Sequence, residues 1–245
     1  MKRLAVLVSI PLLITLNSCN LMQNCPSEEN IRKTLKDKIP ESAKVVSIKQ
    51  VDGVKGVCEV VLKDGMSVAV IYTNKDVSRV FVGHLYETKN HQSLTLKSIR
   101  ENTKLTKDEV SKLDSLVNME LGVGDRFVYY ITAPNCNACK LFEDILLQWA
   151  KEKKVKVKVI LAPNPLDFKS FDTAVSLLCD KKSLEDMRKG YTSENLCEDG
   201  KRLIDNNVKF LYQELKLPGV PHIVAPTGQV ISQIPTKGML DDLIK

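Results

Sequence analysis

Two cysteines separated by two residues, Cys136 and Cys139, stand where a strand pattern gives way to a helical pattern. The run before them, residues 127–131, is apolar and rich in aromatic and β-branched side chains. The apolar residues after them recur at helical spacing: Leu141, Phe142, Ile145, Leu146 and Trp149. A helix start offers unpaired N–H groups and the positive end of the helix dipole, which stabilise the reactive thiolate. The motif therefore predicts a redox-active dithiol.

The rest of the C-terminal half alternates strand and helix patterns around this motif. We expect helices at about 137–151 and 237–244, strands at 155–161 and 223–224, a hairpin after the latter strand, and a helical region at about 168–215. Strand, helix and strand followed by a hairpin and a helix are typical of an α/β domain of thioredoxin type. We predict such a catalytic domain over residues 125–245, with a helical insertion of two helices between its halves.

The N-terminal part has a different pattern. Residues 26–39 have helical spacing, and four runs between residues 43 and 82 have the period of two that is typical of strands. We predict a small α+β domain over residues 19–93, with one helix on an antiparallel sheet. Because so small a sheet has an exposed edge, we expect dimerisation through that edge. A monomer with a shielded edge is the alternative.

The segment between these domains, residues 94–124, contains no strand pattern. It holds a capping box, Thr106 to Glu109, followed by Val110, Leu113, Leu116 and Val117 on one helical face. Gly122 and Gly124 then break the helix. We predict a helical linker.

The first residues are typical of an export signal. Lys2 and Arg3 precede a mostly apolar run, residues 4–16, which is too short to remain as a membrane span. We therefore predict a signal peptide over residues 1–18. The sequence from Leu16 to Cys19 resembles a lipobox, so Cys19 is the predicted lipidation site. Ordinary export with a spare cysteine is the alternative.

The cysteine count agrees with this prediction. The chain has seven cysteines, and removal of Cys19 from the count leaves an even set of six, which an exported protein is expected to oxidise. The pairs we expect are Cys136 with Cys139, Cys179 with Cys197 and Cys25 with Cys58. Only the first pair follows from local geometry, because six cysteines allow fifteen connectivities.

Charge and metal-ligand spacing exclude two other functions. Loss of the signal peptide lowers the Lys and Arg count from 36 to 34 against 30 Asp and Glu, a net charge of +4 that is too weak to indicate nucleic-acid binding. A zinc site needs four ligands, and the chain has neither a second C-x-x-C motif nor suitably spaced histidines among His84, His91 and His222. We expect neither a metal nor a cofactor.

The positions of the two thiols predict their roles. Cys136 at the helix start should be exposed and activated, with a pKa in the lowered range of activated thiols, and should attack a substrate disulfide. Cys139, one turn inside the helix, should be kept a thiol by desolvation and should resolve the mixed disulfide.

A second motif, Leu217 to Pro221, precedes the late strand. In the thioredoxin-like fold, which the order of elements resembles, the proline at the position of Pro221 is cis and packs against the C-x-x-C motif. The residue before it, Val220, offers backbone groups to an extended substrate. We assign His222 an ordinary polar or packing role rather than that of a general base, and Trp149 a place in the core.

Together these features resemble the bacterial DsbC/DsbG family over nearly the whole mature chain. The resemblance rests on the N-terminal sheet with Gly83-His84-Leu85-Tyr86-Glu87 at its end, the capped linker helix, Cys136-Asn137-Ala138-Cys139, Leu161-Ala162-Pro163, the Cys179 and Cys197 pair, and Gly219-Val220-Pro221. It implies a V-shaped periplasmic homodimer with a cystatin-like dimerisation domain. Its two active sites would face a cleft that binds misfolded or incompletely oxidised exported proteins, and a membrane thiol reductant would supply electrons.

The departures from the family leave the direction of exchange open. The dipeptide Asn137-Ala138 is neither of the pairs in the best-known members, and Val220 replaces the usual threonine. A lipid anchor is also not typical of the family. Disulfide isomerase or reductase activity is our leading hypothesis; a dithiol oxidase and a periplasmic holdase chaperone are the alternatives.

Overall fold

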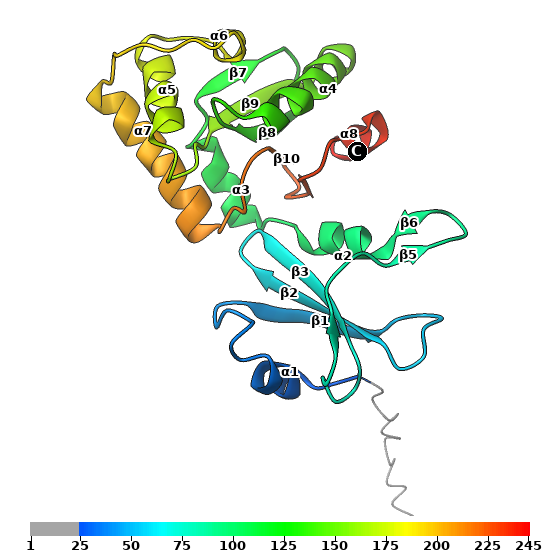
Figure 1. Ribbon diagram of the computed structural model, residues 1–245. Coiled ribbons are helices and arrows are strands. Elements are labelled where there is room, and N and C mark those ends of the chain that lie inside the picture. Colours follow the sequence, from blue (N-terminus) through cyan, green and yellow to red (C-terminus); the bar gives the residue numbers. More distant parts are fainter. Residues whose placement is uncertain (1–24) are drawn as a thin grey trace, which may run out of the picture.

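The computed structural model describes residues 25–245, so the predicted signal peptide over residues 1–18 and the lipidation site Cys19 lie outside the described residues. Figure 1 shows a small domain of sheet and helix at the bottom, a larger α/β domain at the top, and helical segments between them. Within residues 25–245, no helix is long and apolar enough to cross a membrane.

The small N-terminal domain is an antiparallel sheet with one helix, as predicted. The sheet contains four strands in sequence order: β1 (Lys44–Gln50), β2 (Cys58–Asp64), β3 (Ser67–Thr73) and β4 (Val80–Phe81). Helix α1 (Glu28–Thr34) begins at the N-cap Ser27 and places the fully buried Ile31 in a core with Val60 and Ile71 of the sheet. The helix is shorter than the predicted range 26–39, because the chain turns after Thr34.

Between the domains, a short hairpin of β5 (Tyr86–Glu87) and β6 (Gln92–Ser93) leads into α2 (Leu94–Asn102) and α3 (Lys107–Asp114). The predicted capping box is confirmed: the Thr106 hydroxyl accepts from the Glu109 N–H, and the Glu109 carboxylate accepts from the Thr106 N–H.

One element in the linker segment contradicts the expectation that it has no strand. Residues Met119–Leu121 form β7, which pairs antiparallel with β9 (Lys156–Leu161) at the edge of the larger sheet. The strand is only three residues long, which is too short to show a periodicity of two in the sequence.

The larger domain is built on a five-stranded sheet in the order β11-β10-β8-β9-β7. Its central strand β8 (Phe127–Thr132) runs parallel to β9 and antiparallel to β10 (His222–Val224), and β11 (Val230–Ile231) completes the hairpin. Helix α4 (Asn137–Lys153) follows β8, and α8 (Lys237–Asp242) follows the hairpin. This arrangement is thioredoxin-like, and it confirms the predicted fold class.

Alternation along β8 gives the domain a core on each face of the sheet. Val128 and Tyr130 face a core formed with α4, where the predicted core residue Trp149 is fully buried. Tyr129 and Ile131 face a second core formed with α3 and the segment after the inserted helices. The strand that leads to the cysteine motif is therefore held rigidly from both sides.

The helical region between β9 and β10 has more elements than the two helices expected. It contains α5 (Phe168–Cys179), α6 (Leu184–Arg188), α7 (Glu198–Val208) and a π-helical continuation, η1 (Lys209–Glu214). The five-residue α6 begins with a capping box formed by Ser183 and Asp186. So short a helix is specified by its cap rather than by an amphipathic pattern.

Candidate active site

The sulfur of Cys136 caps the first turn of α4. Cys136 is the N-cap residue in an extended conformation, and its Sγ accepts a hydrogen bond from the Cys139 N–H at 3.1 Å. An N-cap acceptor normally satisfies one of the free N–H groups of a helix start. A thiolate at this position would receive the same N–H group and the positive end of the helix dipole. The local geometry therefore suits a reactive Cys136.

The two sulfurs differ in their access to solvent. Cys136 is half-buried, whereas Cys139 is only 1% exposed, and the two are joined by a disulfide. An external thiol or disulfide can approach Cys136 far more easily than Cys139. Burial also disfavours the thiolate form of Cys139 after reduction.

The turn before Cys136 is fixed from two directions. Asn135 adopts the left-handed conformation with φ of 61°, which asparagine tolerates better than most residues. The carbonyl of Pro134 accepts a hydrogen bond of 2.8 Å from the buried Ser170 hydroxyl at the start of α5. The loop that presents the cysteines is therefore tied to the helical insertion.

The Val220–Pro221 peptide bond is cis, as the resemblance to the thioredoxin-like fold implies. It directly precedes β10, in which His222 pairs with Ile131 of β8. Continuing this antiparallel register places Val220 and Pro221 alongside the end of β8, where the cysteine loop begins. Pro221 is buried and Val220 is half-buried, so Val220 is partly accessible to solvent.

His222 has the structural role expected from the sequence. It is 4% exposed, and its Nδ1 lies 2.7 Å from the Ser232 hydroxyl. Burial lowers the pKa of His222 to about 4, so the ring is neutral at neutral pH.

The site also contains a buried carboxylate, Glu143, which is not part of the sequence motifs. Glu143 is 1% exposed, and its Oε1 accepts hydrogen bonds from the hydroxyls of Tyr130, at 3.1 Å, and Thr132, at 3.3 Å. The Tyr130 hydroxyl also lies 3.0 Å from the carbonyl of Cys139. This cluster connects the carboxylate to the backbone of the buried cysteine.

The second oxygen of Glu143 is less well satisfied. No described residue donates a hydrogen bond to Oε2, and its ion-pair partner, Arg188 of α6, lies 3.4 Å away. Burial raises the pKa of Glu143, while the hydrogen bond from Tyr130 and the charge of Arg188 oppose that rise. The sequence did contain a signal, because Glu143 lies on the same helical face as Cys139, Leu146 and Trp149.

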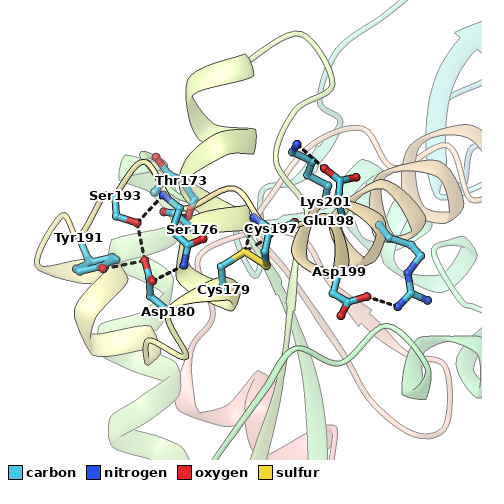
Figure 2. Close-up of a disulfide and its surroundings, with 12 residues drawn as sticks. Thr173, Ser176, Cys179, Asp180, Tyr191, Ser193, Cys197, Glu198, Asp199 and Lys201 are labelled. Atoms are coloured by element: carbon cyan, nitrogen blue, oxygen red, sulfur yellow. Dashed lines mark hydrogen bonds and ion pairs between the residues drawn. A yellow bond between two sulfur atoms is a disulfide. The ribbon is translucent and has the colours of Figure 1, made fainter.

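The Cys179–Cys197 disulfide lies within the helical insertion. It joins the last residue of α5 to the N-cap of α7, and Figure 2 shows it between these two helices. A Cβ on Gly200 would lie 2.7 Å from the Cys179 sulfur, so only glycine fits beside the bridge.

The loop closed by this disulfide is organised by Asp180 (Figure 2). Its carboxylate accepts hydrogen bonds from Tyr191 at 2.9 Å, Ser193 at 2.5 Å and Asn195 at 2.8 Å. These hydrogen bonds lower the pKa of Asp180, with Ser193 as the largest cause. The cluster holds residues 190–197 against the end of α5.

A third disulfide, Cys25–Cys58, ties the chain before α1 to the start of β2. The structure thus joins the same three pairs that we expected. It brings Cys136, Cys139, Val220 and Pro221 to one end of the larger sheet.

Comparison with known proteins identifies the N-terminal domain. Residues 22–96 match the family model of the disulfide bond isomerase protein N-terminal domain, DsbC_N. The DsbC_N match covers α1 and the β1–β4 sheet and ends within α2. It confirms the DsbC/DsbG resemblance for this part of the chain.

Solved structures resemble the chain more distantly. A disulfide interchange protein from Neisseria gonorrhoeae is 19% identical, covers 57% of this chain and 96% of its own, and gives a TM-score of 0.43. Helicobacter pylori DsbG is 15% identical over 80% of this chain and 99% of its own, with a TM-score of 0.36. Proteus mirabilis ScsC in a compact conformation is 19% identical over 61% and 83%, with a TM-score of 0.43. A search of curated proteins gave no match. The function is therefore argued from the site itself.

Proposed function

We propose that this chain is an exported thiol-disulfide interchange enzyme that isomerises or reduces disulfides in other exported proteins. The observation that carries the proposal is the asymmetry of the dithiol. Cys136 is an accessible sulfur at a helix N-cap, and Cys139 is a buried sulfur one turn inside the same helix. This asymmetry supports attack by Cys136 and resolution by Cys139.

The reaction begins with the reduced enzyme. The Cys136 thiolate attacks one sulfur of a substrate disulfide; a bond forms between them, and the other substrate sulfur leaves as a thiolate. In isomerisation, a second substrate thiolate attacks the mixed disulfide and releases Cys136, so no net oxidation occurs. In reduction, Cys139 attacks the sulfur of Cys136, releases the substrate as a thiol and leaves the Cys136–Cys139 disulfide. A membrane thiol reductant would then restore the dithiol.

The backbone at Val220 supplies the binding site for a polypeptide. Only Pro221 separates Val220 from β10, and continuing the register of β10 with β8 places Val220 beside the end of β8. An extended substrate segment could pair with it by strand addition, which places a cysteine of that segment near Cys136. Recognition through backbone groups suits an enzyme that acts on many sequences.

We further propose that the chain is a homodimer formed through its N-terminal domain. The edge strand β4 and the residue after it expose apolar side chains, with Phe81 at 59% and Val82 at 74%. An apolar hollow of about 720 Å³ beside them is lined by residues that include Leu62, Ile71 and Val80. A second copy of this edge would cover both features. Light scattering should give the mass of two chains for the wild type and the mass of one chain for Phe81→Lys. A wild-type mass near that of one chain would reject the dimer.

The proposed location is the periplasm, with a lipid on Cys19. The sequence from Leu16 to Cys19 supports this location, and three disulfides among residues 25–245 suit an oxidising compartment. In cells, the wild type should fractionate with membranes and carry the mass of a lipid, whereas Cys19→Ala should be released. A soluble wild type without added mass would reject the anchor.

The test of the enzyme is the recovery of native disulfides in a scrambled ribonuclease. The reduced wild type should restore ribonuclease activity, and Cys136→Ala should abolish that gain. Cys139→Ser should accumulate a mixed disulfide with the ribonuclease through Cys136. Activity that survives Cys136→Ala would reject the proposal.

The two alternatives have distinct outcomes in the same preparations. A holdase chaperone would suppress aggregation of a reduced substrate equally well with Cys136→Ala, without restoring disulfides. A dithiol oxidase would be found mostly oxidised in cells, whereas an isomerase would be mostly reduced. Measuring the reduction potential of the Cys136–Cys139 pair then gives the direction of exchange.

A further inference from the structure

The turn between β2 and β3 of the N-terminal domain lies directly on the catalytic domain. The Met66 N–H donates to the carbonyl of Leu215 at 2.7 Å, and the Ser67 hydroxyl donates to the carbonyl of Lys216 at 3.2 Å. Asp64 forms an ion pair of 2.5 Å with the ammonium group of Lys216. We call residues 64–67 the hairpin tip.

Packing shows that this contact is close as well as polar. Met66 is 3% exposed and belongs to the same apolar cluster as Leu215 and Leu217, with Val220 packed against that cluster. Gly65 has φ of +62°, and a Cβ there would lie 2.2 Å from the Leu215 carbonyl oxygen. Glycine is therefore required twice, for the backbone conformation and for the close approach.

The segment that the hairpin tip contacts, residues 215–217, continues into the proposed substrate-binding backbone at Val220. Leu217 is also held by its N–H, which donates to the Leu211 carbonyl at 2.8 Å. Only Pro218 and Gly219 separate Leu217 from Val220. A shift of the supported segment would therefore move Val220.

The far end of β10 is held by the linker in the same way. The Leu105 N–H donates to the Gly228 carbonyl at 2.8 Å, and a Cβ on Gly228 would lie 2.1 Å from the Leu105 carbonyl oxygen. Gly228 lies in the turn between β10 and β11. The N-terminal half of the chain thus contacts the segments on both sides of β10, the strand that follows Val220 and Pro221.

We propose that the hairpin tip is a positioning element for polypeptide substrates, which holds the Val220 backbone in register with the dithiol. This inference rests on the proposed disulfide exchange and adds a second role for the N-terminal domain. It predicts that loss of the contact weakens reaction with an extended peptide and leaves the chemistry of the sulfurs unchanged.

The test compares two glycine substitutions in the full-length protein. Gly65→Ala introduces a Cβ against Leu215, whereas Gly53→Ala introduces one at a similar φ, +76°, with nothing within 4 Å. Two substrates are used: a peptide of about twelve residues with one disulfide, and Ellman's reagent, a small disulfide without a peptide backbone. Ellman's reagent reports the reactivity of Cys136 alone.

With the peptide, Gly65→Ala should raise KM about tenfold relative to wild type, because a displaced Val220 backbone would lose about one hydrogen bond to the peptide. Its rate with Ellman's reagent and its reduction potential should match those of wild type, and Gly53→Ala should match wild type throughout. Equal effects of the two substitutions on the peptide, or an equal loss with both substrates, would overturn the inference.

Asp64→Asn provides a second variant that leaves the turn backbone unchanged. It removes the ion pair with Lys216 and should raise KM for the peptide in the same direction, by a smaller factor. An unchanged KM in both Asp64→Asn and Gly65→Ala would overturn the positioning role while wild-type exchange stands. A wild type that exchanges neither substrate would reject the proposed function instead.

Discussion

The buried carboxylate of Glu143 accepts a hydrogen bond from the Tyr130 hydroxyl at 3.1 Å. That hydroxyl has one proton and two acceptors within reach, since the carbonyl of Cys139 lies 3.0 Å away. Protonation of Glu143 would release the hydroxyl to the carbonyl. The charge of Glu143 and the backbone of the buried cysteine are therefore coupled through one hydrogen atom.

Glu143 should increase the stability of the folded protein in mild acid. Burial raises the pKa of Glu143 above its ordinary value of 4.5. The folded state thus binds this proton more tightly, so its contribution to stability is complete below pH 4.5 and is lost as the pH rises through the raised pKa.

Urea unfolding of the wild type and Glu143→Gln at several pH values measures this contribution. The unfolding free energy of the wild type minus that of Glu143→Gln should increase as the pH is lowered from 7 to 4.5. Asp144→Asn is the matched control, because it removes the exposed carboxylate bound by the same Arg188. Parallel profiles for wild type and Glu143→Gln would contradict the assignment.

His222 should have the opposite effect on acid stability. Burial lowers its pKa from 6.5 to about 4, so the unfolded state binds the proton more tightly. Its contribution to stability is complete above pH 6.5 and is lost as the pH falls towards 4, by roughly 2 to 3 kcal/mol. His222→Asn should reduce this loss in urea unfolding between pH 7 and 4.5. His91→Asn, at an exposed site, is the control. A loss of unfolding free energy in His222→Asn as large as that in wild type would refute this role.

The Cys179–Cys197 disulfide should contribute to stability but not to exchange. It closes a loop with a sequence separation of 18, and a bridge of this size contributes about 3 kcal/mol. The double substitution Cys179→Ala and Cys197→Ala should lower the unfolding free energy by about this amount. Alkylation of reduced Cys136 should keep its wild-type rate, and a large change in that rate would mean that the bridge acts on the active site.

The strand-turn-helix unit of the dithiol was predictable because strong local patterns specify each part. Residues 127–131 are uniformly apolar, and the residues after Cys139 repeat at helical spacing. The strand β7 (Met119–Leu121) was not predictable, because three residues carry no period and the strand exists through its pairing with β9. Glu143 was missed because a charged residue on an apolar face is usually taken to be exposed.

The contact between Gly65 and Leu215 shows a different limit. Gly65 lies in the turn between β2 and β3 and has the positive φ that a tight hairpin needs. The partner of that turn lies 150 positions later in the chain, beyond the reach of any local pattern. Whether the glycine serves the turn or a tertiary contact becomes visible only in the folded structure.

The most direct test of Cys136 as the attacking nucleophile is the pH dependence of its alkylation in the reduced full-length protein, followed residue by residue by mass spectrometry. Its N-cap position and partial exposure predict a midpoint well below about 8.5, the value of an ordinary thiol, and modification of Cys136 before the buried Cys139. A midpoint near 8.5, or preferential modification of Cys139, would contradict the assignment of attack to Cys136.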